Sequence, residues 1–295
     1  MVTLKKRVIS GKTYYYLGHT YREKGKIRYK ETYIGRRLPP NTDLIKKNFL
    51  LDIYKEKWFN EFEKIKKVYS KEQKTLPKEI KEKELDAFAV IFTYDTNRIE
   101  GSKLSFKDTS ELLELGISPK NKPVKDIKEA EAHREVFYRM ISFKGELSLK
   151  VVLEWHRGLF ERTKPGIAGQ IRTYQVYISN SRHIPPTPAE LHTNITEFFR
   201  WYSAEKERMN PVELASRSHV KFETMHPFGD GNGRIGRLIM NFILHKKGYP
   251  MLNIKYTGRR SYYTALERSN VKGNEDVFVQ WFFRNYLKEN RKYLS

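Results

Sequence analysis

No cysteine occurs among the 295 residues of the chain. Disulfide bonds and thiolate metal sites are therefore excluded. Long apolar runs are also missing, since no stretch approaches the roughly 18 apolar residues of a membrane span. The first residues, Met-Val-Thr-Leu-Lys-Lys-Arg, lack the apolar core of a secretion signal. We therefore expect a soluble, cytoplasmic protein that does not contact a membrane.

Acidic residues are scarce relative to basic ones. The 35 Asp and Glu residues stand against 57 Lys and Arg residues, which gives a formal net charge of +22. A basic excess of this size suits nucleic acid, an acidic protein partner or an anionic cofactor. Solvated lysines on helix faces would produce the same excess. The length suffices for one large domain and a smaller one.

Residues 1–37 differ from the rest of the chain. They carry eleven Lys or Arg residues against two Glu residues, a net charge of +9. Short alternating segments separated by turn residues predict a small antiparallel β unit, with strands at residues 4–10, 13–22 and 27–34. Six tyrosines lie among these charges: Tyr14, Tyr15, Tyr16, Tyr21, Tyr29 and Tyr33.

Three roles stay open for this β unit. Basic strands interleaved with tyrosines suit a phosphate backbone and stacked bases, so nucleic acid is one candidate partner of residues 1–37. Docking of a target protein, or of a second copy of the chain to give a homodimer, is another. The third role is plain packing, because tyrosine is a good strand former in any context.

Beyond a linker at residues 37–41, apolar spacing predicts helices almost throughout. The expected helices cover residues 44–70, 79–100, 105–115, 126–142, 147–160, 188–205, 211–225, 233–247, 260–268 and 274–290. Between residues 166 and 188, alternating Val176 and Ile178 and the pair Pro185-Pro186 predict an extended hairpin or flap.

The predicted fold is therefore mainly α, with a helical core and a β-hairpin flap, preceded by the small antiparallel β unit. The chain divides into the β unit at residues 1–37, a linker and helix at residues 38–78, and a helical domain at residues 79–295. The core of that domain is expected at about residues 145–250.

One twelve-residue segment, 226–237, carries the chemistry. A glycine-rich turn that opens a helix points backbone N–H groups at an anion. Arginines can grip further phosphate oxygens in forked geometry, a carboxylate can hold Mg²⁺, and a histidine can act as a general base. All of these groups occur in the order His226-Pro-Phe-Gly-Asp-Gly-Asn-Gly-Arg-Ile-Gly-Arg237.

The segment resembles the H-x-F-x-[DE]-G-N-G-R-x-x-R signature of the Fic (Fido) family, and every specified position is met. The matching residues are His226, Phe228, Asp230, Gly231, Asn232, Gly233, Arg234 and Arg237. Residues 153–160 and 169–186 are similar to the family's upstream helix and target-docking flap. The resemblance covers roughly residues 80–290 and leaves the tyrosine-rich N-terminus outside.

The resemblance implies transfer of AMP from ATP onto a hydroxyl side chain of a protein, with the chain itself among the candidate targets. His226 would be the general base and Asp230 would bind Mg²⁺. Backbone N–H groups around Gly231, Asn232 and Gly233 would form the anion hole. Two further side chains, Arg234 and Arg237, would grip the outer phosphates.

A second motif, Thr96-Asn-Arg-Ile-Glu100-Gly101, matches the family's inhibitory [ST]-x-x-x-E-[GN] pattern. It lies in the helix expected at about residues 79–101. The resemblance implies that Glu100 pairs with Arg237 and keeps it from the γ-phosphate. The same glutamate could position a water for the reverse reaction, removal of AMP. A helix that simply ends in a glutamate and a C′ glycine would give the same string.

Six further positions resemble residues with supporting roles in the family. Asn241, Tyr262 and Tyr263 resemble positions near the nucleoside, although each would also suit core packing. On the flap, a target segment could be guided by strand addition along His183, Ile184 and Pro185.

Rival functions remain at this point. Members related to the Doc toxins transfer a phosphoryl group, but they alter the Gly-Asn-Gly-Arg part of the motif that this chain keeps. A different nucleotide donor, such as UTP or GTP, is a second alternative. A nucleic-acid-binding regulator that uses the core only as a nucleotide sensor is the third, and the presence of His226 argues against it.

Overall fold

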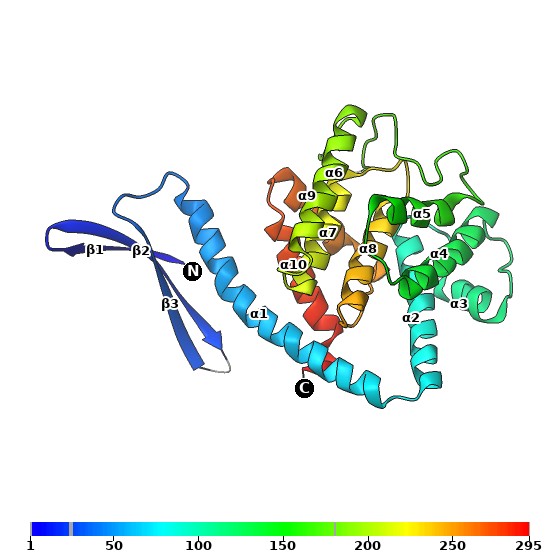
Figure 1. Cartoon of the computed structure of the whole chain (residues 1–295), viewed down its shortest axis with the longest axis horizontal. Coiled ribbons are helices and arrows are strands. Elements are labelled where there is room, and N and C mark those ends of the chain that lie inside the picture. Colours follow the sequence, from blue (N-terminus) through cyan, green and yellow to red (C-terminus); the bar gives the residue numbers. More distant parts are fainter. Residues whose placement is uncertain (1, 24–25, 180, 295) are drawn as a thin grey trace. The chain divides into compact units, whose positions relative to one another are not determined.

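The computed structural model describes residues 2–23, 26–179 and 181–294. It contains two compact units, Met1–Lys64 and Ile65–Ser295, and the division falls within helix α1 (Thr42–Thr75). The expected mainly helical fold with a small antiparallel sheet is confirmed (Figure 1). In the described parts of the chain, no helix combines the length and the apolar character needed to cross a membrane.

The N-terminal unit is a three-stranded antiparallel sheet with the first part of α1. The strands β1 (Thr3–Ile9), β2 (Lys12–Glu23) and β3 (Lys26–Gly35) follow one another in space as in the sequence. Alternation along β2 turns Leu17 toward α1, where it packs on Phe49 and Ile53. Ser10 and Gly11 both have positive φ, which the tight turn between β1 and β2 requires.

The C-terminal unit is helical. Its remaining helices are α2 (Lys78–Ile99), α3 (Phe106–Leu115), α4 (Val124–Ser142), α5 (Leu149–Phe160), α6 (Pro188–Glu205), α7 (Pro211–Met225), α8 (Asn232–Lys246), α9 (Arg259–Val271) and α10 (Asp276–Glu289), with short 3₁₀ turns at Tyr256–Gly258 and Arg291–Tyr293. The expected helices are all present. Their ends differ from the predicted ones by a few residues.

The core of this unit forms around α8, which packs most extensively against α7. All thirteen residues from Asn232 to Leu244 are buried. A helix that is buried all round belongs in the middle of a domain, with its polar residues paired internally. The segment between α7 and α8 is therefore held between two packed helices.

Local sequence signals fix the ends of several helices. The side chain of Ser105 accepts a hydrogen bond from the backbone N–H of Asp108, and the Asp108 carboxylate accepts one from the backbone N–H of Ser105. Thr187 and Glu190 form the same kind of capping box at α6. Each box satisfies backbone N–H groups that a helix N-terminus leaves without a partner.

The flap is present, but the expected strand pairing within it is not formed in the described residues 166–179 and 181–187. Side chains take the place of a backbone ladder. Arg172 donates to the carbonyls of Tyr174 and Pro186, and Gln175 donates to the carbonyl of Pro185. Two prolines in one arm remove the N–H donors that a hairpin ladder needs.

Candidate functional site

The site is built at the junction between α7 and α8. α7 ends at Met225, and the next residue, His226, caps it with a left-handed backbone of φ 49° and ψ 60°. This conformation is uncommon for a residue with a side chain. Two hydrogen bonds from the flap stabilise it: the Arg172 guanidinium donates to the carbonyl of His226, and its backbone N–H donates to that of Pro227.

The loop between the two helices is closed by the side chain of Asn232. Its Oδ1 accepts from the backbone N–H of Phe228 at 2.9 Å, and its Nδ2 donates to the carbonyl of Phe228 at 2.9 Å. Gly231 has φ 83°, and a Cβ there would lie 2.3 Å from the ring of Phe160. The loop therefore accepts only glycine at this position, and its shape is fixed before any ligand binds.

The imidazole of His226 is held in one protonation state. Nδ1 lies 3.3 Å from the carbonyl oxygen of Glu223. Because a carbonyl only accepts, Nδ1 carries the proton and Nε2 keeps its lone pair. Burial lowers the pKa of His226 to about 4, although the Glu223 carbonyl and the Glu100 charge act in the opposite direction. The ring is thus a neutral base at pH 7.

Arg237 lies on α8 with 1% of its surface exposed. Its Nε donates to the hydroxyl of Thr96 at 2.6 Å, and one terminal nitrogen donates to the backbone carbonyl of Thr96 and to Oε1 of Glu100 at 2.6 Å. The other terminal nitrogen donates to the hydroxyl of Tyr262 at 3.4 Å. Burial alone would lower the pKa of Arg237, but Glu100 raises it above its ordinary value, so the guanidinium stays charged.

The carboxylate of Glu100 lies against the first turn of α8. Its Oε1 is 2.2 Å from the place where a Cβ of Gly233 would be. The N-terminus of a helix presents free N–H groups and a partial positive charge to an anion. Glu100, which follows the last residue of α2, therefore occupies the anion-binding end of α8 and neutralises Arg237 from the same position.

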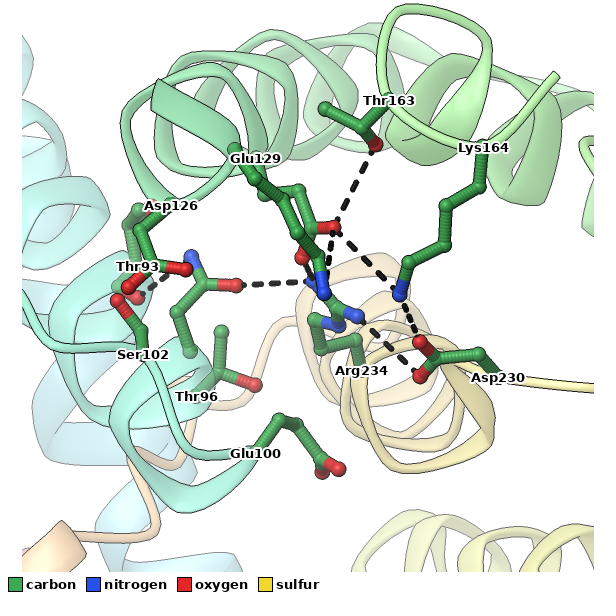
Figure 2. A network of polar contacts seen from close by, with 12 residues as sticks. Thr93, Thr96, Glu100, Ser102, Asp126, Glu129, Thr163, Lys164, Asp230 and Arg234 are labelled. Carbon is green, nitrogen blue, oxygen red and sulfur yellow. Dashed lines mark hydrogen bonds and ion pairs between the residues drawn. The ribbon is translucent and has the colours of Figure 1, made fainter. Parts of the chain in front are cut away.

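A second polar network lies next to Glu100, around Arg234 in the first turn of α8 (Figure 2). Arg234, 3% exposed, donates to Glu129 of α4 at 2.5 Å and to Asn97 of α2 at 3.2 Å. It lies 3.5 Å from Oδ1 of Asp230, whose other oxygen contacts the ammonium of Lys164. The Lys164 ammonium is also 3.6 Å from Glu129.

Asp230 is the one predicted metal ligand. Burial tends to raise its pKa, but Arg234 and Lys164 lower it below the ordinary value, so the carboxylate is ionised. In the described parts of the chain, no group of three or more His, Asp or Glu side chains is arranged to hold a metal. A single carboxylate suits Mg²⁺, which usually keeps several waters and shares its remaining positions with substrate phosphates.

A cavity of about 540 Å³ opens in front of this junction. Its lining includes His226, Asp230, Gly231–Gly233 and Glu100, together with flap residues 177–179 and 181. Tyr262 and Tyr263 of α9 also line it, and their place near a nucleoside stays a prediction. Burial raises the pKa of Tyr263 to about 12, and its hydroxyl donates to the carbonyl of Ile99. The cavity thus brings together most of the predicted site residues.

Asn241 is placed elsewhere. It is fully buried, and its amide donates to and accepts from the backbone of Leu252 at 3.1 and 2.8 Å. Both of its polar atoms are therefore used to hold the loop after α8. The structure gives this side chain a packing role and does not place it in the lining of the cavity.

The three flap residues lie differently from one another. His183 is tied to α7, because its Nε2 lies 2.8 Å from the carbonyl of Thr224. Pro185 is buried, whereas Ile184 is 66% exposed. Only Ile184 of the three therefore presents its side chain freely to a passing chain.

Four site residues have no counterpart among the predicted ones: Glu129, Lys164, His156 and Glu223. His156 accepts from the N–H of Gly169 and donates to the carbonyl of Asp230, so it positions the loop from α5. Burial raises the pKa of Glu223 to about 8. Two of the four residues had a local signal, because Glu223 lies three residues before His226 and His156 lies in the stretch 153–160 that resembles the family's upstream helix. Glu129 and Lys164 lie in segments that carry no motif.

Residues 146–244 match the model of the Fic/DOC family. The chain carries a Fic/DOC domain. The matched range runs from just before α5 into α8 and includes the flap and the His226–Arg237 segment. The N-terminal unit and α2, which carries Thr96 and leads into Glu100, lie outside it.

Relatives and solved structures extend this assignment. The protein adenylyltransferase Fic of Nematostella vectensis is 33% identical over 196 residues, which are 65% of this chain and 45% of that protein. The chain spans less than half the length of the curated relatives it matches. A Fic domain containing signaling protein from Bacteroides thetaiotaomicron aligns with TM-score 0.69 and 26% identity, over 78% of this chain and 95% of that one.

A structure of residues 134–508 of Fic-1 from C. elegans has the same fold. It aligns with TM-score 0.72 at 23% identity, over 87% of this chain and 77% of that chain. The Fic/DOC domain of this protein thus has the same fold as these solved structures.

The buried histidines of the Fic/DOC domain predict an acid-sensitive fold. Burial lowers the pKa of His133 and His219 to about 3 and that of His156 and His226 to about 4, from an ordinary value of 6.5. Between pH 6.5 and 4 the unfolded chain therefore binds more protons than the folded one. Each such histidine removes up to about 1.4 kcal/mol of unfolding free energy per pH unit as the pH falls.

Glu223 acts in the opposite direction, because its folded pKa of about 8 lies above the ordinary 4.5. Its contribution to the free energy of unfolding is lost as the pH rises toward 8. Urea unfolding should show stability decreasing from pH 6.5 to pH 8 in the wild type, and no such decrease in Glu223→Gln. Below pH 6.5 both proteins should lose stability, and a flat profile there would contradict the burial of neutral histidines.

Proposed function

We propose that the chain transfers AMP from Mg·ATP to a serine, threonine or tyrosine hydroxyl of a protein, and that Glu100 restrains this activity. The protein adenylyltransferases among its relatives support the reaction class. The observation that carries the proposal is the position of the Glu100 carboxylate. An anion already occupies the N-terminus of α8, between Gly233 and Arg237, in front of a neutral histidine.

His226 would act as the general base. Its Nε2 has a free lone pair, because Nδ1 donates to the carbonyl of Glu223. Nε2 would accept the proton of the target hydroxyl while the hydroxyl oxygen bonds to the α-phosphorus and pyrophosphate leaves. Base catalysis of this kind contributes about 10²–10⁴ in rate. The low pKa keeps the base unprotonated at physiological pH.

The triphosphate would lie along the first turn of α8. The backbone N–H groups of Gly231–Gly233 would face the phosphates at this end of the helix, and the missing side chain at Gly233 leaves room for an anion. Arg237 would contact the outer phosphates once Glu100 withdraws. Arg234, held by Glu129 and Asn97, is already rigid and would add a second cation.

Asp230 would hold Mg²⁺ together with phosphate oxygens. When bound, Mg²⁺ supplies neutralisation of the negative charge that develops on the phosphates. The ammonium of Lys164 now contacts the Asp230 carboxylate, and it also lies near Glu129. Lys164 would therefore turn toward Glu129 when the cation binds, so that no carboxylate in this network loses its counter-charge.

Glu100 would restrain the reaction by competition for one guanidinium. The Arg237–Glu100 pair is almost fully buried on the arginine side, and a phosphate would have to replace the carboxylate. A coupling of about 1–3 kcal/mol between the two states is typical of such control. Because Glu100 and His226 line the same cavity, removal of AMP by a water held at Glu100 is the second candidate activity.

Replacement of Glu100 should release the restraint. We expect Glu100→Gly to incorporate AMP from radiolabelled ATP about 5- to 150-fold faster than the wild type, in itself or in an added target. Glu100→Gln should give a smaller gain, because the amide can still accept from Arg237. Glu135→Gln is the matched control. It removes the charge of an exposed glutamate that pairs with Arg162, and it should not change the rate. Equal rates in all four proteins would rule out the restraint.

Loss of the base should remove transfer while leaving nucleotide binding. In the Glu100→Gly background we expect His226→Ala to lower the rate by about 10²–10⁴. Intact-mass spectrometry should find an AMP adduct on the Glu100→Gly chain and none on the double variant. ATP binding by calorimetry should be similar in both. A double variant that still accumulates the adduct would exclude the proposed chemistry.

Lys164 should compete with the metal for Asp230. We expect Lys164→Met to bind Mn²⁺ roughly 10-fold more tightly in the presence of ATP, because an adjacent positive charge has been removed. Electron paramagnetic resonance of free Mn²⁺ measures this directly. Lys125→Met is the control. Lys125 lies 3.9 Å from Glu129, whereas among the described residues it is Lys164 whose ammonium contacts Asp230. Equal affinities in both variants would contradict the competition.

A further inference from the structure

The sheet of the N-terminal unit has one face packed on α1 and one face free of it. Cross-strand partners point to the same side of a sheet, and neighbours along a strand to opposite sides. Leu17 packs on α1, so Tyr16 and its partners Lys5 and Tyr33 lie on the other face. This free face includes Lys5, Arg7, Tyr14, Tyr16, Gly18, Tyr29, Glu31 and Tyr33.

Aromatic rings cover much of this free face. Tyr33 lies 6.1 Å from Tyr14 and 5.4 Å from Tyr16 between ring centroids. Tyr29 crosses the middle strand at Gly18, where a Cβ would lie 2.2 Å from the Tyr29 hydroxyl. Because Gly18 has no side chain, the Tyr29 ring can pack flat against the backbone of the sheet. Tyr29 and Tyr33 are each 49% exposed, which is unusual for such large side chains.

Cations lie over these rings. The Lys5 ammonium is 4.6 Å from the centroid of Tyr29, and the Arg7 guanidinium is 4.6 Å from that of Tyr16. Glu31 is the acidic residue of the face. It accepts from Arg7 at 2.7 and 2.9 Å and from the Tyr29 hydroxyl at 2.9 Å, which orients both side chains. The face is thus a rigid set of alternating rings and positive charges.

We propose that this face binds single-stranded nucleic acid. Such strands are recognised by basic surfaces that follow the phosphates and by aromatic rings on which bases stack. The free face offers both within one sheet, and residues 1–37 carry a net charge of +9. An acidic peptide would pair with the positive charges of the face, but it has no bases to stack on the exposed tyrosine rings. The proposal is independent of the transfer reaction, because it concerns another part of the chain.

The test uses the full-length chain and a fluorescein-labelled oligothymidylate of about 20 nucleotides, followed by fluorescence anisotropy over a range of KCl concentrations. Lys5 and Lys6 are neighbours on β1 that point to opposite faces. We expect Lys5→Glu to weaken binding and to reduce the salt slope by about 0.7, the value for one phosphate contact on a single strand. Lys6→Glu makes the same change in net charge and should have a much smaller effect.

The rings are tested separately. The double variant Tyr29→Ala/Tyr33→Ala should bind about 5- to 150-fold more weakly, as expected for the loss of one base stack or more. Tyr29→Phe/Tyr33→Phe keeps the rings and should bind like the wild type. Circular dichroism and melting temperature confirm that each variant is folded.

Any one of the following outcomes would overturn the proposal. They are no binding by the wild type, equal effects of Lys5→Glu and Lys6→Glu, unchanged affinity in the double alanine variant, and competition by polyglutamate as effective as by unlabelled oligothymidylate. Tighter binding of a duplex of the same length would also overturn it, because paired bases are not free to stack on the tyrosines.

Discussion

The buried charge of Arg237 is the constraint on which the rest of the site depends. A guanidinium with almost no exposure needs hydrogen bonds and a counter-charge, because leaving it unpaired would cost several kcal/mol. The partners come from two other helices: Thr96 from α2, Glu100 at its end, and Tyr262 from α9. One side chain of α8 therefore determines how these elements meet. An anionic ligand can satisfy the same need, which makes the arginine both a structural and a binding group.

Charges around the first turn of α8 are balanced without a ligand. Three cations, Arg234, Arg237 and Lys164, face three carboxylates, Glu100, Glu129 and Asp230. Adding a triphosphate would leave an excess of negative charge in a partly buried place. A divalent cation and the withdrawal of Glu100 together offset most of this excess. Nucleotide, metal and restraint are thus expected to act as one electrostatic system.

The sequence predicted the parts of this structure that local patterns control. Helix periodicity located the helices, and the glycine-rich turn located the start of α8. Contacts between residues far apart in the chain could not be predicted in this way. For Asn241 the sequence left a place near the nucleoside and core packing both open, and the hydrogen bonds to the backbone of Leu252 favour packing. The carbonyls of the flap accept from Arg172 and Gln175, so the missing ladder is not visible in the local sequence. Glu129 and Lys164 were missed because only folding brings Glu129 to Arg234 and Lys164 to Asp230.

The absence of a side chain at Gly233 has a consequence for how variants of this protein would behave. The restraining carboxylate lies in the small volume that a Cβ at this position would fill, and the proposed phosphate position is the same. A bulkier residue there would displace the Glu100 carboxylate and also block the proposed phosphate site, so restraint and activity would be lost together. Under the proposed mechanism, gain-of-function changes should arise on the α2 side, at Thr96 or Glu100, while changes in the first turn of α8 should only inactivate.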